Sequence, residues 1–251
     1  MKSATVLLLG IIIMLIPCGS ALAFPNDSTS VSSDLKFKPS ALIIPTALIT
    51  FGVHNFKNPV VRDLNGEIQE ELMENIDRKI TADDFTQYVP MVAVYGLNAC
   101  GIKGKNDFAN RTLILATAYA IMGTTVTTMK YSIDVERPDG SGNNSFPSGH
   151  TATAFMAAEF LFQEYRDVSV WYGISGYALA AATGYFRMHN NRHWLTDVAA
   201  GAGIGILSTK IAYWVNPFLR EKVFKGKKTS QTAILPYYNG EQFGLALSFK
   251  F

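Results

Sequence analysis

The chain has 251 residues, of which 48% are hydrophobic and 17% are charged, and its formal net charge is +2. This length and apolar content suit one compact domain with a substantial core. A net charge so close to zero provides no broad basic surface, so we expect no nucleic-acid partner.

Residues 1–23 have the pattern of a secretory signal peptide. A lysine precedes an apolar run over residues 6–17, and Ala-Leu-Ala at 21–23 offers a cleavage site. Lipid attachment at Cys18 is an alternative, but the proline before this cysteine fits that pattern poorly. We therefore expect an exported protein of the bacterial cell envelope.

Helical segments follow a flexible lead-in over residues 24–38, which is rich in Ser, Asp and Pro. Six segments with few or no charges have the length and the Ala, Leu, Met and Gly content of helices. They cover residues 39–53, 85–102, 112–129, 149–165, 168–186 and 198–218. An acidic, amphipathic stretch at 67–80 predicts a surface helix. The sequence thus predicts an all-α fold, a bundle of about six apolar helices within one helical domain at 39–219.

Whether these helices cross a membrane is left open by the sequence. A spanning helix needs about 20 apolar residues, several runs here stop at 18 or 19, and the mean hydropathy is only +0.13. A soluble bundle is therefore the alternative to a membrane-associated one. Basic stretches at 103–111 and 220–228 would be cytoplasmic in a membrane protein, with the loops after residues 129 and 186 facing outward. That orientation agrees with a cleaved signal if residues 39–53 do not cross.

The end of the chain, residues 220–251, reads as a basic linker followed by a short tail. Residues 243–251 alternate apolar with small or polar side chains, which is strand periodicity. A turn at Asn239-Gly240 would pair this strand with the segment before it. We therefore expect a short C-terminal β-hairpin.

Three clusters carry the chemistry, and the first contains Lys130 and the pair Arg137-Pro138. Seven residues are nearly two helical turns, so both cations can face one side of a helix if that helix continues as far as Arg137. Taken alone, the pair is better explained as a basic helix end that meets the C-terminal dipole.

The second cluster is the tetrapeptide from Pro147 to His150, at the start of the predicted helix 149–165. Ser148 can cap this helix, and Gly149 lets the backbone approach a ligand beside the free N–H groups of the first turn. His150 can then donate a proton to a bound oxyanion near neutral pH. The alternative is an ordinary Ser-Gly cap with an incidental histidine.

The third cluster contains Arg187, His193 and Asp197. The i to i+4 spacing of His193 and Asp197 places both on one helix face, where the carboxylate can hold one ring nitrogen. The other nitrogen is then free to act as a nucleophile. An isolated His-Asp pair is more often structural.

The order of the segments brings these clusters together. Lys130 ends the third predicted helix and His150 begins the fourth. Arg187 ends the fifth and His193 begins the sixth. In an up-and-down bundle these four ends lie on the same side, where three cations can neutralise a bound phosphate.

Other residues near the third cluster receive lesser roles. His189 and Arg192 lie in a polar loop and are expected at most to support the site. Trp194 can line the pocket or simply pack. The run GAGIG at 201–205 follows no predicted strand, so we interpret it as close helix packing and not as a nucleotide loop.

With these motifs, the sequence resembles the type 2 phosphatidic-acid phosphatase and vanadium haloperoxidase superfamily. Its signature is Lys, six residues, Arg-Pro, then Pro-Ser-Gly-His, then Ser-Arg, five residues, His, three residues, Asp. The match covers residues 130–197 directly, and the flanking segments suit the family's all-helical fold from about residue 40 to 219. One position departs, because Phe186 stands where the family has a serine and so removes a hydroxyl near the phosphate pocket.

The resemblance implies a phosphatase without metal or cofactor that works through a phosphohistidine. His193 would attack phosphorus, Asp197 would orient it, and His150 would protonate the departing oxygen. The residues that would hold the phosphate oxygens are Lys130, Arg137, Ser148, the Gly149 amide and Arg187.

Several functions are compatible with this site. The first is hydrolysis of a lipid phosphate facing the periplasm, with lipid A, phosphatidate, phosphatidylglycerophosphate or undecaprenyl diphosphate as candidate substrates and the membrane as partner. The alternatives are a soluble, exported acid phosphatase of broad specificity, a vanadium haloperoxidase, and a non-enzymatic envelope scaffold. The sequence identifies no protein partner.

Overall fold

The computed structural model describes residues 39–55, 58–74, 81–224, 231–238 and 243–250. The predicted signal peptide and lead-in, and the hairpin turn at Asn239-Gly240, lie outside these residues. The chain divides into two compact units, residues 1–216 and residues 217–251.

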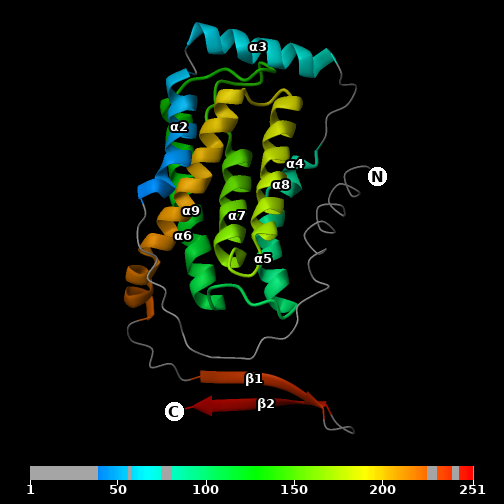
Figure 1. Cartoon of the computed structure of the whole chain (residues 1–251), viewed down its shortest axis with the longest axis vertical. Coiled ribbons are helices and arrows are strands. Elements are labelled where there is room, and N and C mark those ends of the chain that lie inside the picture. The colour runs from blue at the N-terminus through cyan, green and yellow to red at the C-terminus, as the bar shows by residue number, and fades with distance from the viewer. Residues whose placement is uncertain (1–38, 56–57, 75–80, 225–230, 239–242, 251) are drawn as a thin grey trace. The chain divides into compact units, whose positions relative to one another are not determined.

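The first unit is built from helices (Figure 1). In chain order they are η2 (Pro39–Leu42), α2 (Ile43–Asn55), α3 (Pro59–Glu74), α4 (Asp83–Thr86), α5 (Val89–Ala99), α6 (Phe108–Ser132), α7 (Gly149–Tyr165), α8 (Val170–His189) and α9 (Leu195–Phe224). Helix α9 continues past residue 216 into the second unit. The predicted all-α bundle is confirmed.

Two segments differ most from the sequence-based expectation. The helix predicted over 85–102 is two helices, because a turn at Gln87 and Tyr88 separates α4 from α5. Pro90 lies in the first turn of α5, where its missing N–H is harmless, whereas the interior of a longer helix would not accommodate it. The amphipathic helix begins at Pro59, earlier than predicted, again with a proline in its first turn.

Helix α7 is the central helix of the bundle, and 13 of its 17 residues are buried. It contacts α5, α6 and α8. Met156, Phe160 and Leu161 of α7 belong to the main hydrophobic cluster, together with Val94 of α5 and Ile204 of α9. This helix carries Ser148 at its N-terminal cap and His150 in its first turn, so the packing of its core face fixes their position.

Close contact between α7 and α9 depends on glycines of the GAGIG run. A Cβ atom on Gly201 would lie 2.5 Å from the carbonyl oxygen of Ser148, and one on Gly205 would lie 2.2 Å from that of Ala152. No side chain fits at these distances, so α9 can approach α7 only with glycine here. The interpretation of this run as close helix packing is confirmed, and the contact holds the start of α9 beside the start of α7.

Gly205→Ala is expected to lower the free energy of unfolding by about 1–3 kcal/mol, because the added methyl group meets a backbone oxygen that cannot move freely. Thermal unfolding in detergent measures the effect. The matched control is Gly123→Ala on α6, where a new Cβ meets nothing within 4 Å. The control should stabilise by up to about 1 kcal/mol. Equal midpoints for the two variants would contradict the close contact.

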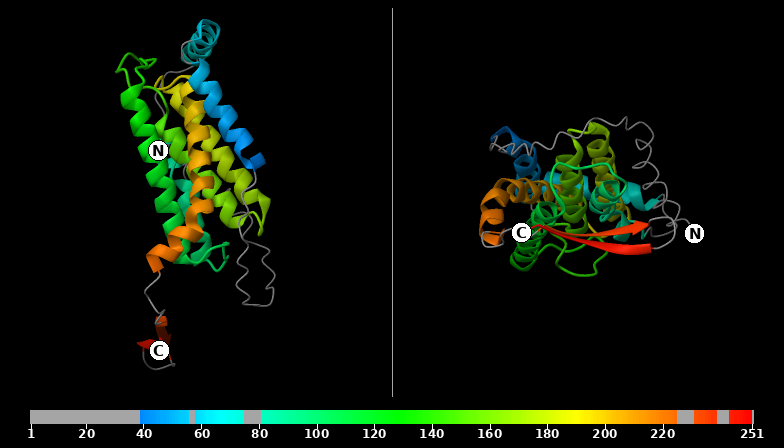
Figure 2. Two further views of the ribbon diagram at one scale, coloured as in Figure 1. Left: turned by 90° about the vertical axis from the view of Figure 1, so that its left-hand side faces the viewer. Right: turned by 90° about the horizontal axis from the view of Figure 1, so that it is seen from below.

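Two helices among the described residues are long and apolar enough to cross a membrane, Phe108–Ser132 and Leu195–Val223. A third candidate arises if the bent pair of α2 and α3, whose axes differ by 98°, counts as one span. Because of this bend, α3 lies across one end of the bundle in two perpendicular views (Figures 1 and 2). The candidate spans are identified by the length and apolar composition of the helices.

The second unit contains a two-stranded antiparallel sheet. Strand β1 (Gln231–Tyr238) pairs with β2 (Phe243–Lys250) along their whole length, with Gln231 opposite Lys250 and Tyr238 opposite Phe243. The predicted C-terminal β-hairpin is confirmed.

Candidate active site

The loop between α6 and α7 brings the residues of the first cluster close together. It folds back on itself, since the amide of Val135 donates to the carbonyl of Asn143 at 3.0 Å. Asn144 accepts hydrogen bonds from both cations. Lys130 Nζ donates to its backbone oxygen at 2.6 Å, and Arg137 Nε donates to its side-chain oxygen at 2.9 Å. The partners of Lys130 and Arg137 in the described chain are neutral oxygens, so both charges remain available to an anion.

Ser148 joins the second cluster to the third. It is the N-cap of α7, and its hydroxyl accepts a hydrogen bond from the amide of Thr151 at 3.4 Å, as the sequence predicts. Its own amide donates to the backbone oxygen of Asp197 at 3.0 Å. This backbone contact holds the start of α7 against the start of α9, so the two motifs lie at the same end of the bundle.

His193 and Asp197 form the predicted pair. Nδ1 of His193 lies 3.4 Å from Oδ2 of Asp197. The same carboxylate oxygen accepts from Ser145 Oγ at 2.5 Å and from the amide of Trp194 at 3.0 Å. An oxygen surrounded by donors fixes the proton of His193 on Nδ1 and leaves a lone pair on Nε2.

The surroundings keep His193 neutral. Its exposed fraction is 3%, and burial lowers the pKa of the ring to about 4, with the charges of Arg187 and Lys130 acting in the same direction against Asp197. Desolvation disfavours the charged form of an imidazole. The ring is therefore unprotonated at neutral pH and carries the lone pair that a nucleophile needs.

Arg187 is held by two carboxylates of α4. Its Nη1 lies 2.5 Å from Asp83 Oδ2 and 3.9 Å from Asp84 Oδ1. Asp83 is 1% exposed and also accepts from the side chain of Asn190 at 3.2 Å. The buried Nε of Arg187 has no hydrogen-bond partner among the residues that the structure describes. A donor of this kind favours an anionic ligand, because leaving it unpaired costs free energy.

His150 contacts the other carboxylate of the same helix. Its Nε2 lies 3.1 Å from Asp84 Oδ1, and the side chains are 33% and 54% exposed. Burial and the charge of Arg187 lower the pKa of His150, while Asp83 and Asp84 partly offset this effect. Asp84 thus places one carboxylate oxygen between His150 and Arg187, in the kind of position that a phosphate oxygen could take.

The charges of the cluster act on one another. Burial lowers the pKa of Arg137, and the neighbouring charges of Arg187 and Arg192 lower it further. The charge of Arg187 also lowers the pKa of both His150 and His193. The predicted cations and histidines therefore lie close enough for their charges to interact. Such a concentration of positive charge disfavours each cation and favours a bound anion.

The residues given lesser roles lie at the edge of this site. Arg192 pairs with Asp139 at 3.1 Å. Phe186 packs its ring against those of Tyr185 and His189, at centroid distances of 5.8 and 6.4 Å.

Sequence reasoning missed Asp83, Asp84 and Ser145. The aspartates precede an apolar run, where acids usually mark only a helix start, and Ser145 carries no spacing signal of its own. Within the described residues, no group of three or more His, Cys, Asp or Glu side chains could hold a metal ion.

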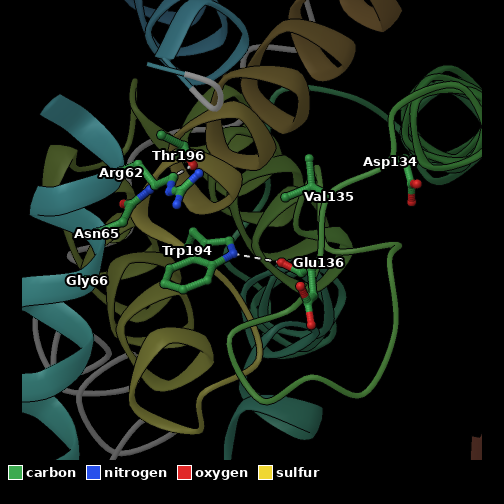
Figure 3. A pocket seen from close by; sticks show the side chains of 8 residues that line it. All are labelled: Arg62, Asn65, Gly66, Asp134, Val135, Glu136, Trp194 and Thr196. Carbon is green, nitrogen blue, oxygen red and sulfur yellow. Dashed lines mark hydrogen bonds between the residues drawn. The ribbon is translucent and has the colours of Figure 1, made fainter. Parts of the chain in front are cut away.

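A cavity of about 510 Å³ is lined in part by Trp194, the residue that follows His193 in the chain (Figure 3). Its lining residues are Arg62, Asn65, Gly66, Asp134, Val135, Glu136, Trp194 and Thr196. A second gap of about 10 Å³ is lined by His193 itself and by residues of α3. Helix α3 therefore covers the end of the bundle at which the site lies.

The region that contains the three clusters is similar to known proteins. The family model of the PAP2 superfamily matches residues 111–221. A lipid A 1-phosphatase of Porphyromonas gingivalis is 35% identical over 77% of this chain and 45% of its own length. The bacitracin transport permease protein BcrC of Bacillus licheniformis is 38% identical over 31% of this chain and 36% of its own length. The chain thus spans less than half the length of these curated relatives.

A likeness to a solved structure concerns the fold. The transmembrane PAP2-type phosphatidylglycerolphosphate phosphatase of Bacillus subtilis superimposes with a TM-score of 0.50 at 19% identity. The alignment covers 74% of this chain and 98% of the other.

Proposed function

Because the chain belongs to the PAP2 superfamily, we propose that it is a phosphatase that hydrolyses the phosphate ester of a lipid. The observation that supports this most directly is the joining of the second and third clusters at Ser148 and Asp197, beside Arg187. This places a neutral, oriented imidazole within a group of cations. Such a combination suits attack on a phosphate and has no evident use in a purely structural bundle end.

The proposed reaction has two steps. In the first, the lone pair of His193 Nε2 forms a bond to phosphorus while the bond from phosphorus to the leaving oxygen breaks, and His150 gives its proton to that oxygen. In the second, a water oxygen attacks phosphorus, the P–N bond breaks, and His150 takes the proton of the water. Asp197 stabilises the positive charge that His193 carries in between.

The phosphate oxygens have a complete set of donors in this proposal. Lys130 reaches them from the last turn of α6, Arg137 from the loop before α7, and Arg187 from the end of α8. Ser148 and the amide of Gly149 contribute the N-terminal end of α7, where the helix dipole favours negative charge. Three cations offset the charge of a phosphate monoester and stabilise its transition state.

The membrane is the proposed location of the substrate. The two candidate spans run from Phe108 to Ser132 and from Leu195 to Val223. Lys130 lies at the end of the first and His193 just before the second, which supports a site on one side of the membrane. The basic stretches at 103–111 and 220–228 lie at their other ends and favour a cytoplasmic position. We therefore propose an active site on the outer side of the membrane, the periplasmic side in a two-membrane bacterium.

The substrate of a relative supports one candidate among several. Lipid A 1-phosphatase is the name of the Porphyromonas gingivalis relative, and phosphatidate, phosphatidylglycerophosphate and undecaprenyl diphosphate remain the others. Phosphate release from each lipid by the purified protein in detergent tests the proposal. Release from at least one lipid at a rate above that for a small soluble ester is the expected result. Brisk hydrolysis of small esters with no release from any lipid would contradict it.

Asp84→Asn is expected to shift the basic limb of the kcat/KM profile to lower pH. Asp84 raises the pKa of His150, so its removal lowers that pKa. The general acid is then lost at a lower pH as pH rises. KM should fall at the same time, since the carboxylate no longer competes with phosphate for His150 and Arg187. Steady-state kinetics between pH 4 and about pH 9 measure both effects.

Asp107→Asn is the control for this change. Asp107 caps α6 and accepts from the amide of Asn110, so it carries the same charge, and no hydrogen bond joins it to either histidine in the described part of the chain. Its pH profile should match that of the wild type. An unchanged basic limb in Asp84→Asn, or an equal shift in both variants, would show that Asp84 has no specific effect on the pKa of the proton donor.

A further inference from the structure

We propose that Trp194, Arg192 and Gln69 are positioning residues, which hold the loop that carries Arg137 against the turn that carries His193. The inference rests on the proposed phosphatase function and concerns residues that act on the phosphate through Arg137. We call the contacts of these three side chains the loop bridge. The loop bridge connects the first cluster with the third.

Arg137 is the proposed phosphate-binding cation that lies outside a helix. Lys130 lies in the last turn of α6 and Arg187 in the last turn of α8, whereas Arg137 lies in the loop before α7. Its amide donates to the carbonyl of Gly142 at 2.8 Å, and its Nε donates to the side chain of Asn144 at 2.9 Å. Both partners belong to the same loop. The position of Arg137 relative to the nucleophile therefore depends on contacts with other segments.

Trp194 makes the first contact of the loop bridge. Its indole Nε1 donates to the backbone oxygen of Glu136 at 2.8 Å (Figure 3). Trp194 follows His193 in the chain, and Glu136 precedes Arg137. The amide of Trp194 donates to Asp197 Oδ2 at 3.0 Å. Trp194 thus binds the carboxylate of the nucleophile with its backbone and the segment of the cation with its side chain.

An ion pair makes the second contact. Arg192 Nη1 lies 3.1 Å from Asp139 Oδ2. The other oxygen of Asp139 accepts from the amide of Ser141 at 3.1 Å, which fixes the carboxylate within its own loop. The two side chains are 37% and 17% exposed. A pair with this much exposure adds little to the stability of a fold, so its expected effect is on the position of the loop.

Gln69 of α3 makes the third contact. Its Nε2 donates to Asn191 Oδ1 at 2.8 Å and to the backbone oxygen of Pro138 at 3.4 Å. The side-chain NH₂ group of glutamine carries two hydrogens, so it can serve both acceptors at once. Helix α3 therefore holds the loop of the first cluster and the turn of the third with one side chain.

Electrostatic repulsion gives the loop bridge a purpose. Its contacts meet the chain on both sides of Arg137, at positions 136, 138 and 139. Burial lowers the pKa of Arg137, and the charge of Arg187 lowers it further. Two cations so close repel each other until an anion lies between them. The loop bridge opposes this repulsion and keeps the guanidinium of Arg137 in place for the phosphate.

Trp194→Phe tests the first contact, because it removes the N–H donor and keeps an aromatic ring. The variant should lower kcat/KM for a lipid phosphate by about 10-fold, with an unchanged midpoint of thermal unfolding. Trp171→Phe is the matched control, since Trp171 is 65% exposed on α8, and its kcat/KM should equal that of the wild type. Wild-type kcat/KM in Trp194→Phe would overturn the proposal.

A double-mutant cycle separates positioning from a general loss of structure. In an Arg137→Ala background, Trp194→Phe should cause no further loss, because the residue through which it acts is already absent. In a Lys130→Ala background, the loss of about 10-fold should persist. A further loss of about 10-fold in the Arg137→Ala background would overturn the proposal, since Trp194 would then act by another route.

The ion pair has a test of its own. Positioning predicts that Arg192→Ala and Asp139→Ala both lower kcat/KM, each by about fivefold, and that the double variant loses no more than either single one. A direct effect of these charges on the phosphate predicts opposite signs, with a gain for Asp139→Ala. Opposite signs, or losses that add fully, would overturn the proposal.

Gln69→Ala tests the contact from α3 and should lower kcat/KM by about fivefold. Glu70→Ala, at the exposed neighbouring position, should leave it unchanged. An equal loss in both variants would mean a general effect on α3 and would overturn the role of Gln69.

Binding of inorganic phosphate separates this inference from the proposed reaction. By titration calorimetry, Trp194→Phe should bind inorganic phosphate about 10-fold more weakly than the wild type. Weaker binding in a protein that releases phosphate from no substrate would refute the phosphatase and retain the positioning role. Wild-type binding and wild-type lipid hydrolysis by Trp194→Phe would do the reverse. A wild-type protein that neither binds nor releases phosphate would overturn both.

Discussion

His193→Gln is expected to lower kcat for lipid phosphate hydrolysis by about 10⁴-fold or more, since it removes the proposed nucleophile. Glutamine keeps a side chain of similar length that can still donate to Asp197, so the buried surroundings are little disturbed. Its amide nitrogen has no free lone pair with which to attack phosphorus. The measurement is phosphate release under saturating substrate, with thermal unfolding recorded to confirm the fold.

A covalent intermediate gives this prediction a second readout. After an alkaline quench with a substrate labelled on phosphorus, the wild-type protein should retain label through the P–N bond, and His193→Gln should retain none. His189→Gln is the matched control, because this ring packs against Tyr185 and Phe186 and has no part in the proposed steps. Label on His193→Gln, or near-normal turnover by it, would refute the phosphohistidine.

The residues of the three clusters could be found from the sequence because all but Arg137 lie near the end of a helix. Local rules then fix their neighbourhoods. Ser148 is the kind of residue that caps a helix, and a spacing of four joins His193 to Asp197. The alternation of helix direction in a bundle places these ends on one side. Local structure and a simple topology together were enough for the positions of the cations and histidines, while their roles stay predictions.

The carboxylates of α4 could not be found in this way. Asp84 is 66 residues from His150, and Asp83 is 104 residues from Arg187. No periodic pattern connects positions so far apart. Both aspartates lie on α4, which a break at Gln87 and Tyr88 separates from α5, and the apolar run from residue 85 conceals this break. Long-range pairing of charges is a property of packing, which a single sequence does not display.

The role of α3 was likewise hidden. Its sequence predicts a surface helix, and much of it is exposed. The bend of 98° relative to α2 directs it across the bundle end, where Asn65 contacts Thr196 and Gln69 contacts Asn191 at 2.8 Å. Helix α3 thereby becomes a wall of the cavity beside the site. Amphipathicity predicts which face of such a helix is buried but not what that face meets.

Asp197 is the residue on which the orientation of the nucleophile depends. Its Oδ2 accepts from Ser145 Oγ, from the amide of Trp194 and from His193 Nδ1. A carboxylate oxygen can only accept, so Ser145 Oγ and His193 Nδ1 both donate to it, as the Trp194 amide must. The carboxylate is 0% exposed, and a buried charge of this kind acts strongly on the ring beside it.

Asp197→Asn is therefore expected to lower kcat by about 10³–10⁴-fold while the chain stays folded. An amide that turns its NH₂ group toward His193 makes Nδ1 an acceptor and moves the proton to Nε2, so the lone pair for attack is lost. Ser145→Ala is the matched comparison, because it removes one donor and keeps the carboxylate, and about a 10-fold loss at most is expected. Phosphate release by both variants measures the difference. Activity of Asp197→Asn within tenfold of the wild type, or an equal loss in Ser145→Ala, would show that the charge of Asp197 does not orient the ring.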